Sequence, residues 1–139
     1  MTEAQAIELI DAQMVAQWPT VSGGLPLALE NEALPTADSF AMLTIKHTVA
    51  DPYTAGPAGS RRVERRGWIF VKLWGPADAG RKGISTLADG VRSIFEGQQL
   101  STGSGEPVTI STGLTQEVGV DGRYYMVVVS FALRYYGTF

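Results

Sequence analysis

The sequence has no cysteine and only one histidine, His47. The absence of cysteine excludes a disulfide scaffold, thiol catalysis and any thiolate metal site. A single histidine excludes metal sites built on two imidazoles and leaves at most one imidazole for acid–base chemistry. We therefore expect no enzyme, no metal centre and no cofactor.

Long apolar runs are also missing. No stretch approaches the ~18 consecutive apolar residues of a membrane-spanning helix, so no membrane partner is expected. The first residues, MTEAQAIELIDAQ, include three acidic residues and no basic one, so we expect no secretory or transit signal. The 139 residues fit one domain spanning 1–139, and 45% hydrophobic with 18% charged residues is typical of a folded chain.

The net charge of -3 hides an uneven distribution along the chain. Residues 1–60 hold seven acidic residues against one basic residue, Lys46, which sums to -6. Residues 61–139 hold ten basic and seven acidic residues, which sums to +3. Such an asymmetric surface suits a nucleic-acid partner or a second copy of the chain packed head to tail.

Two segments have the periodicity of helices. The first begins at Thr2, with Gln5 in the capping-box position, and is expected to end at Trp18-Pro19 because a residue before proline disfavours the helical region. Its predicted apolar stripe is Ile7, Ile10, Met14 and Val15. The second spans roughly 79–96, with Asp78 as its cap, Gly97 as its left-handed end and a stripe of Ile84, Leu87, Ala88, Val91 and Phe95.

The other segments predict strands at 27–30, 40–49, 61–74, 108–120 and 123–136. The last two form a hairpin around Asp121-Gly122, and residues 50–60 form a flexible loop rich in proline and glycine. This order predicts an α+β fold with a largely antiparallel sheet of four to five strands and both helices on one face. The sheet would be mixed if the passage from 61 to 120 were a right-handed crossover.

Strands 61–74 and 123–136 carry apolar residues on both faces, so both are expected to be covered on both sides. The helices would cover one side, and a neighbouring subunit would cover the other.

A basic run opens the strand 61–74. Arg62 and Arg66 should project to one side and Arg61 and Arg65 to the other, with Trp68 and Phe70 following Arg66 on its side. A cationic strip beside aromatic rings resembles a nucleic-acid stacking platform, but the pI of about 5.1 argues against a dedicated nucleic-acid binder. A solvated strand end and a charged subunit interface both fit, and the acidic first sixty residues favour the interface.

No residue pattern points to catalysis. His47 lacks a local nucleophile or carboxylate partner, so we expect a partly buried structural histidine. Asp89 and Glu96 fit a solvated helix face. Gly75 and Gly80 precede Arg81 and Lys82, which do not match the Lys-Ser/Thr pair of a phosphate-binding loop.

One long pattern is specific enough to compare with a known family. It consists of Arg66-Gly67-Trp-Ile-Phe-Val-Lys-Leu-Trp-Gly-Pro76, then Gly80, then Leu87-Ala-Asp-Gly-Val-Arg-Ser-Ile-Phe-Glu-Gly97. With the first helix, the loop before the arginines and the chain length, this pattern resembles the tail terminator (tail completion, minor tail) proteins of long-tailed bacteriophages.

The resemblance implies a structural virion protein at the head-proximal end of the phage tail, made in the host cytoplasm. Such proteins form a homohexameric ring that caps the tail tube, stops its polymerisation and meets the head-side connector. Double-stranded DNA would pass the ring without sequence readout. The expected ring contacts are Arg61, Arg62, Arg65, Arg66, Trp68 and Phe70, and the expected tube or connector contacts are Asp51, Pro52, Tyr53, Gly56 and Pro57.

Two alternatives stay open. Another head–tail joining or minor tail protein would have a similar small α+β fold and ring assembly. A monomeric nucleic-acid or ligand-binding domain would instead use the strand from Arg61 to Phe70 as its binding surface.

Overall fold

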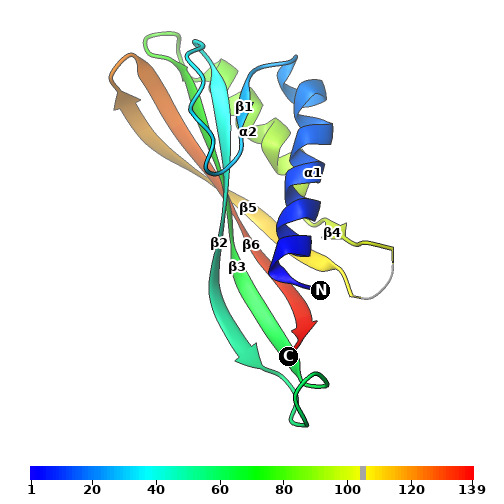
Figure 1. Cartoon of the computed structure of the whole chain (residues 1–139). Helices are drawn as coiled ribbons and strands as arrows, with labels where there is room; N and C mark the ends of the chain where they lie inside the picture. Colours follow the sequence, from blue (N-terminus) through cyan, green and yellow to red (C-terminus); the bar gives the residue numbers. More distant parts are fainter. Residues whose placement is uncertain (104–105) are drawn as a thin grey trace.

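The chain folds into one curved sheet with two helices packed on a single face (Figure 1). The computed structural model describes residues 1–103 and 106–139, and of Asp121 it describes only the backbone; residues 104–105, in the expected loop after the second helix, lie outside the described residues. The elements in chain order are α1 (Glu3–Ser22), β1 (Leu27–Ala28), β2 (Phe40–Pro52), β3 (Arg62–Pro76), α2 (Lys82–Phe95), β4 (Gln99–Leu100), β5 (Val108–Asp121) and β6 (Tyr124–Thr138).

The strand order is β1-β2-β3-β6-β5-β4, and the α+β class with a largely antiparallel sheet is confirmed. The described residues form six strands rather than four to five, because β4, a two-residue pairing at one edge of the sheet, was not predicted. The strand predicted at 27–30 is present as β1, which is also two residues long. The sheet is mixed, but the predicted reason was wrong. β3 and β5 point in the same direction, but they are not neighbours, because β6 lies between them and pairs antiparallel with both. The parallel pairing that makes the sheet mixed is between β1 and β2.

The core lies between the sheet and the helices. Along β3 and β6, odd-numbered residues face the helices and even-numbered residues face away, as the two-residue period of a strand requires. The buried sheet residues of this core include Ala41, Leu43, Ile45, Ile69, Val71, Leu73, Val127, Val129, Phe131 and Leu133. Phe131 packs edge-on against Phe95 of α2, with 5.5 Å between ring centroids.

Helix α1 begins as predicted, with the reciprocal Thr2–Gln5 capping box, but it does not end at Trp18-Pro19. It continues to Ser22, because Trp18 is buried and its indole Nε1 donates a hydrogen bond of 2.7 Å to the Leu25 carbonyl. Pro19 is exposed, and the left-handed Gly23 ends the helix one turn later.

The buried stripe of α1 also differs from the prediction. Its buried residues are Ala6, Ile10, Met14 and Trp18, which are spaced four residues apart. Ile7 and Val15 were predicted to be core residues, but they are 37% and 52% exposed. Each lies about 100° around the helix from its buried neighbour, beyond the edge of the sheet-facing stripe.

The stripe of α2 is confirmed, with Ile84, Ala88, Val91 and Phe95 buried and Leu87 half-buried, but the predicted start of the helix was wrong. Asp78 is not its cap: it has a φ of 67° in the turn after β3, and α2 begins at Lys82. β3 extends to Pro76, so the turn takes the residues that the prediction gave to the helix. Gly97 is left-handed as predicted, with a φ of 70°. Among the described residues, neither helix is long and apolar enough to cross a membrane.

Two connections differ in their bounds from the prediction. β2 runs to Pro52, so Asp51 and Pro52 pair with Glu64 and Val63 of β3 instead of lying in a loop. The hairpin turn occupies Gly122 and Arg123, because the bulge between Glu117 and Gly119 shifts the register of β5 by one residue. Gly122 has a φ of 62°, the left-handed region that a tight hairpin turn requires.

Gly67 marks the closest approach of β2 and β3. A Cβ on Gly67 would lie 2.2 Å from the carbonyl oxygen of Lys46.

Gly67→Ala should therefore force the strands apart and lower the free energy of unfolding by about 2–4 kcal/mol, measured by urea denaturation. Gly83→Ala is the matched control: nothing lies within 4 Å of its Cβ position, so helix propensity should raise stability by about 0.5–1 kcal/mol. Equal stability of Gly67→Ala and wild type would contradict this packing.

Candidate interaction surfaces

The predicted arginine strip is paired within the chain. Arg65 binds Glu3 of α1 at 3.0 Å, and Arg66 binds Asp51 and Glu64 at 2.8 and 3.1 Å. Arg62 pairs with Glu106, and Arg61 donates to the Gly56 carbonyl and lies 5.6 Å from the ring centre of Phe139. These arginines therefore hold the ends of the sheet, the first helix and the loop together.

The strip divides between the two faces of the sheet as the alternation predicts. Arg65 points to the helix side, where its partner Glu3 begins α1, whereas Arg66 shares the opposite side with Trp68 and Phe70. The rings of Trp68 and Phe70 are stacked at 6.4 Å between centroids. Trp68 is 41% exposed, which is unusual for the largest apolar side chain in the middle of a central strand.

Apolar and basic side chains share the middle of the face that the helices leave uncovered. We call this surface the open face. Its residues are Lys46, Trp68, Phe70, Lys72, Leu114, Ala132 and Arg134. Leu114 is 58% exposed, and Lys46 lies directly across from Trp68 in the register.

The open face does not extend over the whole sheet. At the end nearest the turn after β3, Phe40 stacks on Trp74 at 4.7 Å and meets Tyr124 edge-on at 5.4 Å. The chain's own segment before β2 contacts this aromatic group, because the Tyr124 hydroxyl donates to the Ala37 carbonyl at 3.1 Å. The chain itself therefore covers part of the sheet face that was predicted to be covered by a neighbouring subunit.

Basic residues outside the predicted strip distinguish the open face. Among the described side chains, Lys46, Lys72 and Arg134 have no carboxylate partner, unlike the neighbouring Arg66. These three residues were not predicted, because they are far apart in the sequence and do not belong to the run of adjacent arginines. All three have even residue numbers, like Trp68, so aligning the strands by register places them on the same face as Trp68.

The predicted contact loop lies at the far end of β2 and β3, away from both helices (Figure 1). Tyr53 is 59% exposed, and its ring lies 5.3 Å from that of Tyr136. Gly59 and Arg61 both donate backbone hydrogen bonds to the Phe139 carbonyl, at 2.8 and 3.3 Å. The base of the loop is thus tied to the last residue of the chain, and Gly56 and Pro57 lie at its exposed tip.

His47 is half-buried, in agreement with a structural role. Its Nε2 shares a hydrogen bond of 2.6 Å with the hydroxyl of Tyr135, which is fully buried. Burial raises the pKa of Tyr135 to about 12, and the nearby Glu3 carboxylate adds to the increase. The pair therefore lies where a substrate cannot reach the phenol.

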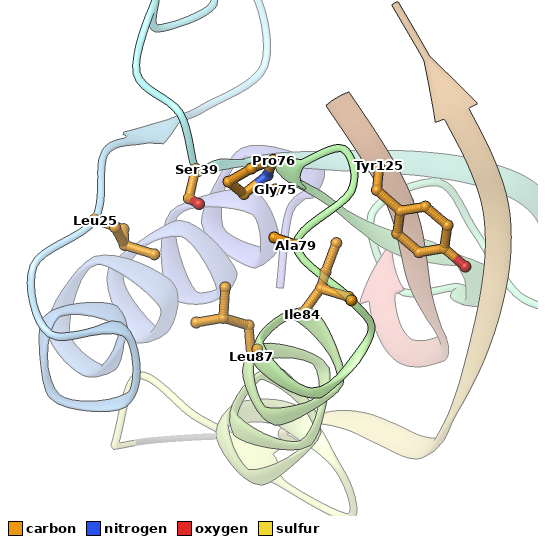
Figure 2. A pocket seen from close by; sticks show the side chains of 10 residues that line it. Leu25, Ser39, Gly75, Pro76, Ala79, Ile84, Leu87 and Tyr125 are labelled. Carbon is orange, nitrogen blue, oxygen red and sulfur yellow. The ribbon is translucent and has the colours of Figure 1, made fainter. Parts of the chain in front are cut away.

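One hollow in the described part of the chain is mainly apolar. Its volume is about 260 Å³, and it lies between the turn after β3 and the start of α2 (Figure 2). Leu25, Ile84 and Leu87 contribute apolar side chains to its wall, and Ser39 and Tyr125 contribute hydroxyls. Among the described residues, no cluster of side chains could hold a metal ion, and no buried side-chain nitrogen or oxygen lacks a partner.

The Tyr135 phenol predicts a stability change in alkali. The folded chain keeps the phenol proton up to a pKa of about 12, whereas an unfolded tyrosine loses it near pH 10.0. Ionisation therefore favours the unfolded chain, and stability should fall as the pH rises from 10.0 toward about 12. Tyr135→Phe should flatten this part of the curve of urea midpoint against pH, and the exposed Tyr53→Phe should leave it unchanged. An unchanged slope in Tyr135→Phe would show that other groups cause the loss.

Comparisons with known proteins place the fold. No protein-family model and no curated protein matches this chain. Among similar solved structures, one that carries no functional name has a TM-score of 0.68 at 18% identity, covering 91% of this chain and 93% of its own. Another, from the virion of a native gene transfer agent particle, has a TM-score of 0.66 at 14% identity, covering 96% and 97%. At these identities the likeness establishes a shared fold over nearly the whole chain.

Proposed function

We propose that this protein is a structural virion protein, a tail terminator that forms a homohexameric ring on the end of a phage-like tail tube. One observation carries the proposal: the fold matches a chain of a gene transfer agent virion over 96% of this chain and 97% of that chain. The motif from Arg66 to Gly97, which resembles the tail terminator family, supports the same role.

The two faces of the sheet are suited to a ring. A closed ring needs one surface of each copy to meet a different surface of the next copy. Here one face of the sheet is covered by two helices, of which α1 lies in the acidic first sixty residues. The other face leaves Trp68 exposed beside basic residues that have no carboxylate partner among the described side chains. Trp68 and Phe70 of the predicted interface stay in the proposed ring contact, and the arginines before them support the strand ends.

The exposed loop after β2 gives the ring a surface for other proteins. The loop between β2 and β3, which includes Tyr53, Gly56 and Pro57, projects beyond the helices at one end of the sheet (Figure 1). Asp51 and Pro52 lead into it from β2. In the proposed virion, this end meets the tail tube or the head-side connector, and double-stranded DNA passes through the ring without sequence readout. Catalysis has no part in this role, which needs binding surfaces alone.

Tube growth tests the proposed function directly. A purified phage tail tube protein is polymerised with and without this protein, and tube lengths are measured by electron microscopy. A terminator should stop elongation and appear as a ring at one tube end. Tyr53→Ala with Pro57→Gly should weaken capping roughly tenfold while the fold and ring stay intact, because the tip loses its rigid contacts.

The alternatives have different outcomes in this experiment. A head–tail joining or minor tail protein would bind a virion partner without changing tube length. A monomeric nucleic-acid-binding domain would ignore tubes and bind single-stranded DNA, with an affinity that falls as salt rises. Either result would overturn the terminator role.

A further inference from the structure

An acidic surface lies on the side of the molecule opposite the open face. The exposed side of α1 carries Glu8 and Asp11 between the exposed apolar residues Ile7 and Val15. Partial burial raises the pKa of Asp11, and the nearby carboxylates of Glu30 and Glu32 raise it further. We call this surface, Ile7, Glu8, Asp11, Val15, Glu30 and Glu32, the acidic face.

Among the described side chains, no salt bridge joins a carboxylate of the acidic face to a basic residue. The first lysine or arginine in the sequence is Lys46. Of the acidic residues in α1, only Glu3 forms a described salt bridge, and its partner is Arg65. Repulsion from the Glu30 and Glu32 carboxylates adds to the effect of burial on the pKa of Asp11. A cationic partner would remove this repulsion.

The open face has the complementary chemistry. Lys46, Lys72 and Arg134 surround Trp68 and Phe70 and lack carboxylate partners among the described side chains. Each surface therefore combines exposed apolar side chains with unpaired charge of one sign, and the two signs are opposite. Complementary charge around an apolar centre is the arrangement of a specific protein contact.

We propose that the acidic face of one copy docks on the open face of the next copy, so that helix and sheet layers alternate around the assembly. This contact rests on the proposed ring and names the two surfaces that close it. The surfaces lie on opposite sides of the sheet, so the contact is heterologous and each copy has one of each surface free for a neighbour. Charged contacts between unlike faces also set the direction of packing, because two acidic faces repel each other.

Double-stranded DNA is also a polyanion and is the alternative partner for the basic residues of the open face. The second copy is the better occupant because it also buries Trp68 and Leu114, which DNA phosphates would leave in water. It also accounts for the acidic face, for which DNA offers no partner. DNA binding by the open face is therefore an outcome of the test.

Paired charge reversals test the contact. Lys46→Glu with Arg134→Glu reverses the open face, and Glu8→Lys with Asp11→Lys reverses the acidic face; Lys46, Arg134 and Glu8 are exposed, and none of the four side chains forms a described salt bridge. Each reversed chain alone should self-associate roughly tenfold more weakly or worse, measured by mass photometry and analytical ultracentrifugation. Lys82→Glu, an exposed reversal on α2, is the control and should assemble like wild type.

Mixing the two reversed chains is the decisive step. In the mixture every contact pairs opposite charges again, so assembly should return, and the chain carrying all four substitutions should assemble alone. Recovery also shows that the variants are folded, and circular dichroism of each variant checks this directly.

The failures have separate meanings. Tube capping and wild-type-like assembly by both reversed chains would overturn this contact and leave the proposed function intact. A wild-type chain that neither self-associates nor caps tubes would overturn both. Unchanged assembly with loss of double-stranded DNA binding in Lys46→Glu with Arg134→Glu would assign the open face to DNA instead.

Discussion

The pairing of β3 with β6 is the constraint on which the rest of the structure depends. The two strands pair without a register shift from Arg62 opposite Thr138 to Pro76 opposite Tyr124. Because side chains alternate along both strands, this register places Ile69, Val71 and Val129 toward the helices and Trp68 and Phe70 away from them. A one-residue slip would exchange the two faces, so the core and the open face are fixed together.

The long sheet has more surface than two helices can cover. Both helices pack on one side, where buried residues of α1 and α2 join the sheet in a single core. The aromatic group around Phe40 and Trp74 is sheltered by the chain's own segment before β2. The middle of the other side has no such cover among the described residues, and its Trp68 is 41% exposed. Exposed apolar surface of this kind is typical of protein–protein contacts.

Local patterns predicted most of the fold. The apolar stripe of α2, the left-handed Gly97 and the central strands follow from spacing within one segment, and the structure contains them. The errors arose where distant residues decide. Helix α1 continues past Pro19 because Trp18 is buried and its indole donates a hydrogen bond to the Leu25 carbonyl. The bulge at Gly119 moved the hairpin turn by one residue.

The candidate site was harder to predict for the same reason. A run of four arginines is visible in the sequence, but their partners Glu3 and Glu106 are remote along the chain and close only after folding. Lys46, Lys72 and Arg134 come from three strands, so no local window contains them. Aligning the strands by register brings them together around Trp68.

Native mass spectrometry of the full chain tests the central claim most directly, that unlike faces of one sheet close this protein into a ring. The account predicts one dominant closed hexamer, formed alone or on addition of tail tubes, with no higher series. A monomer at every concentration with and without tubes, or an open-ended ladder of oligomers, would contradict it.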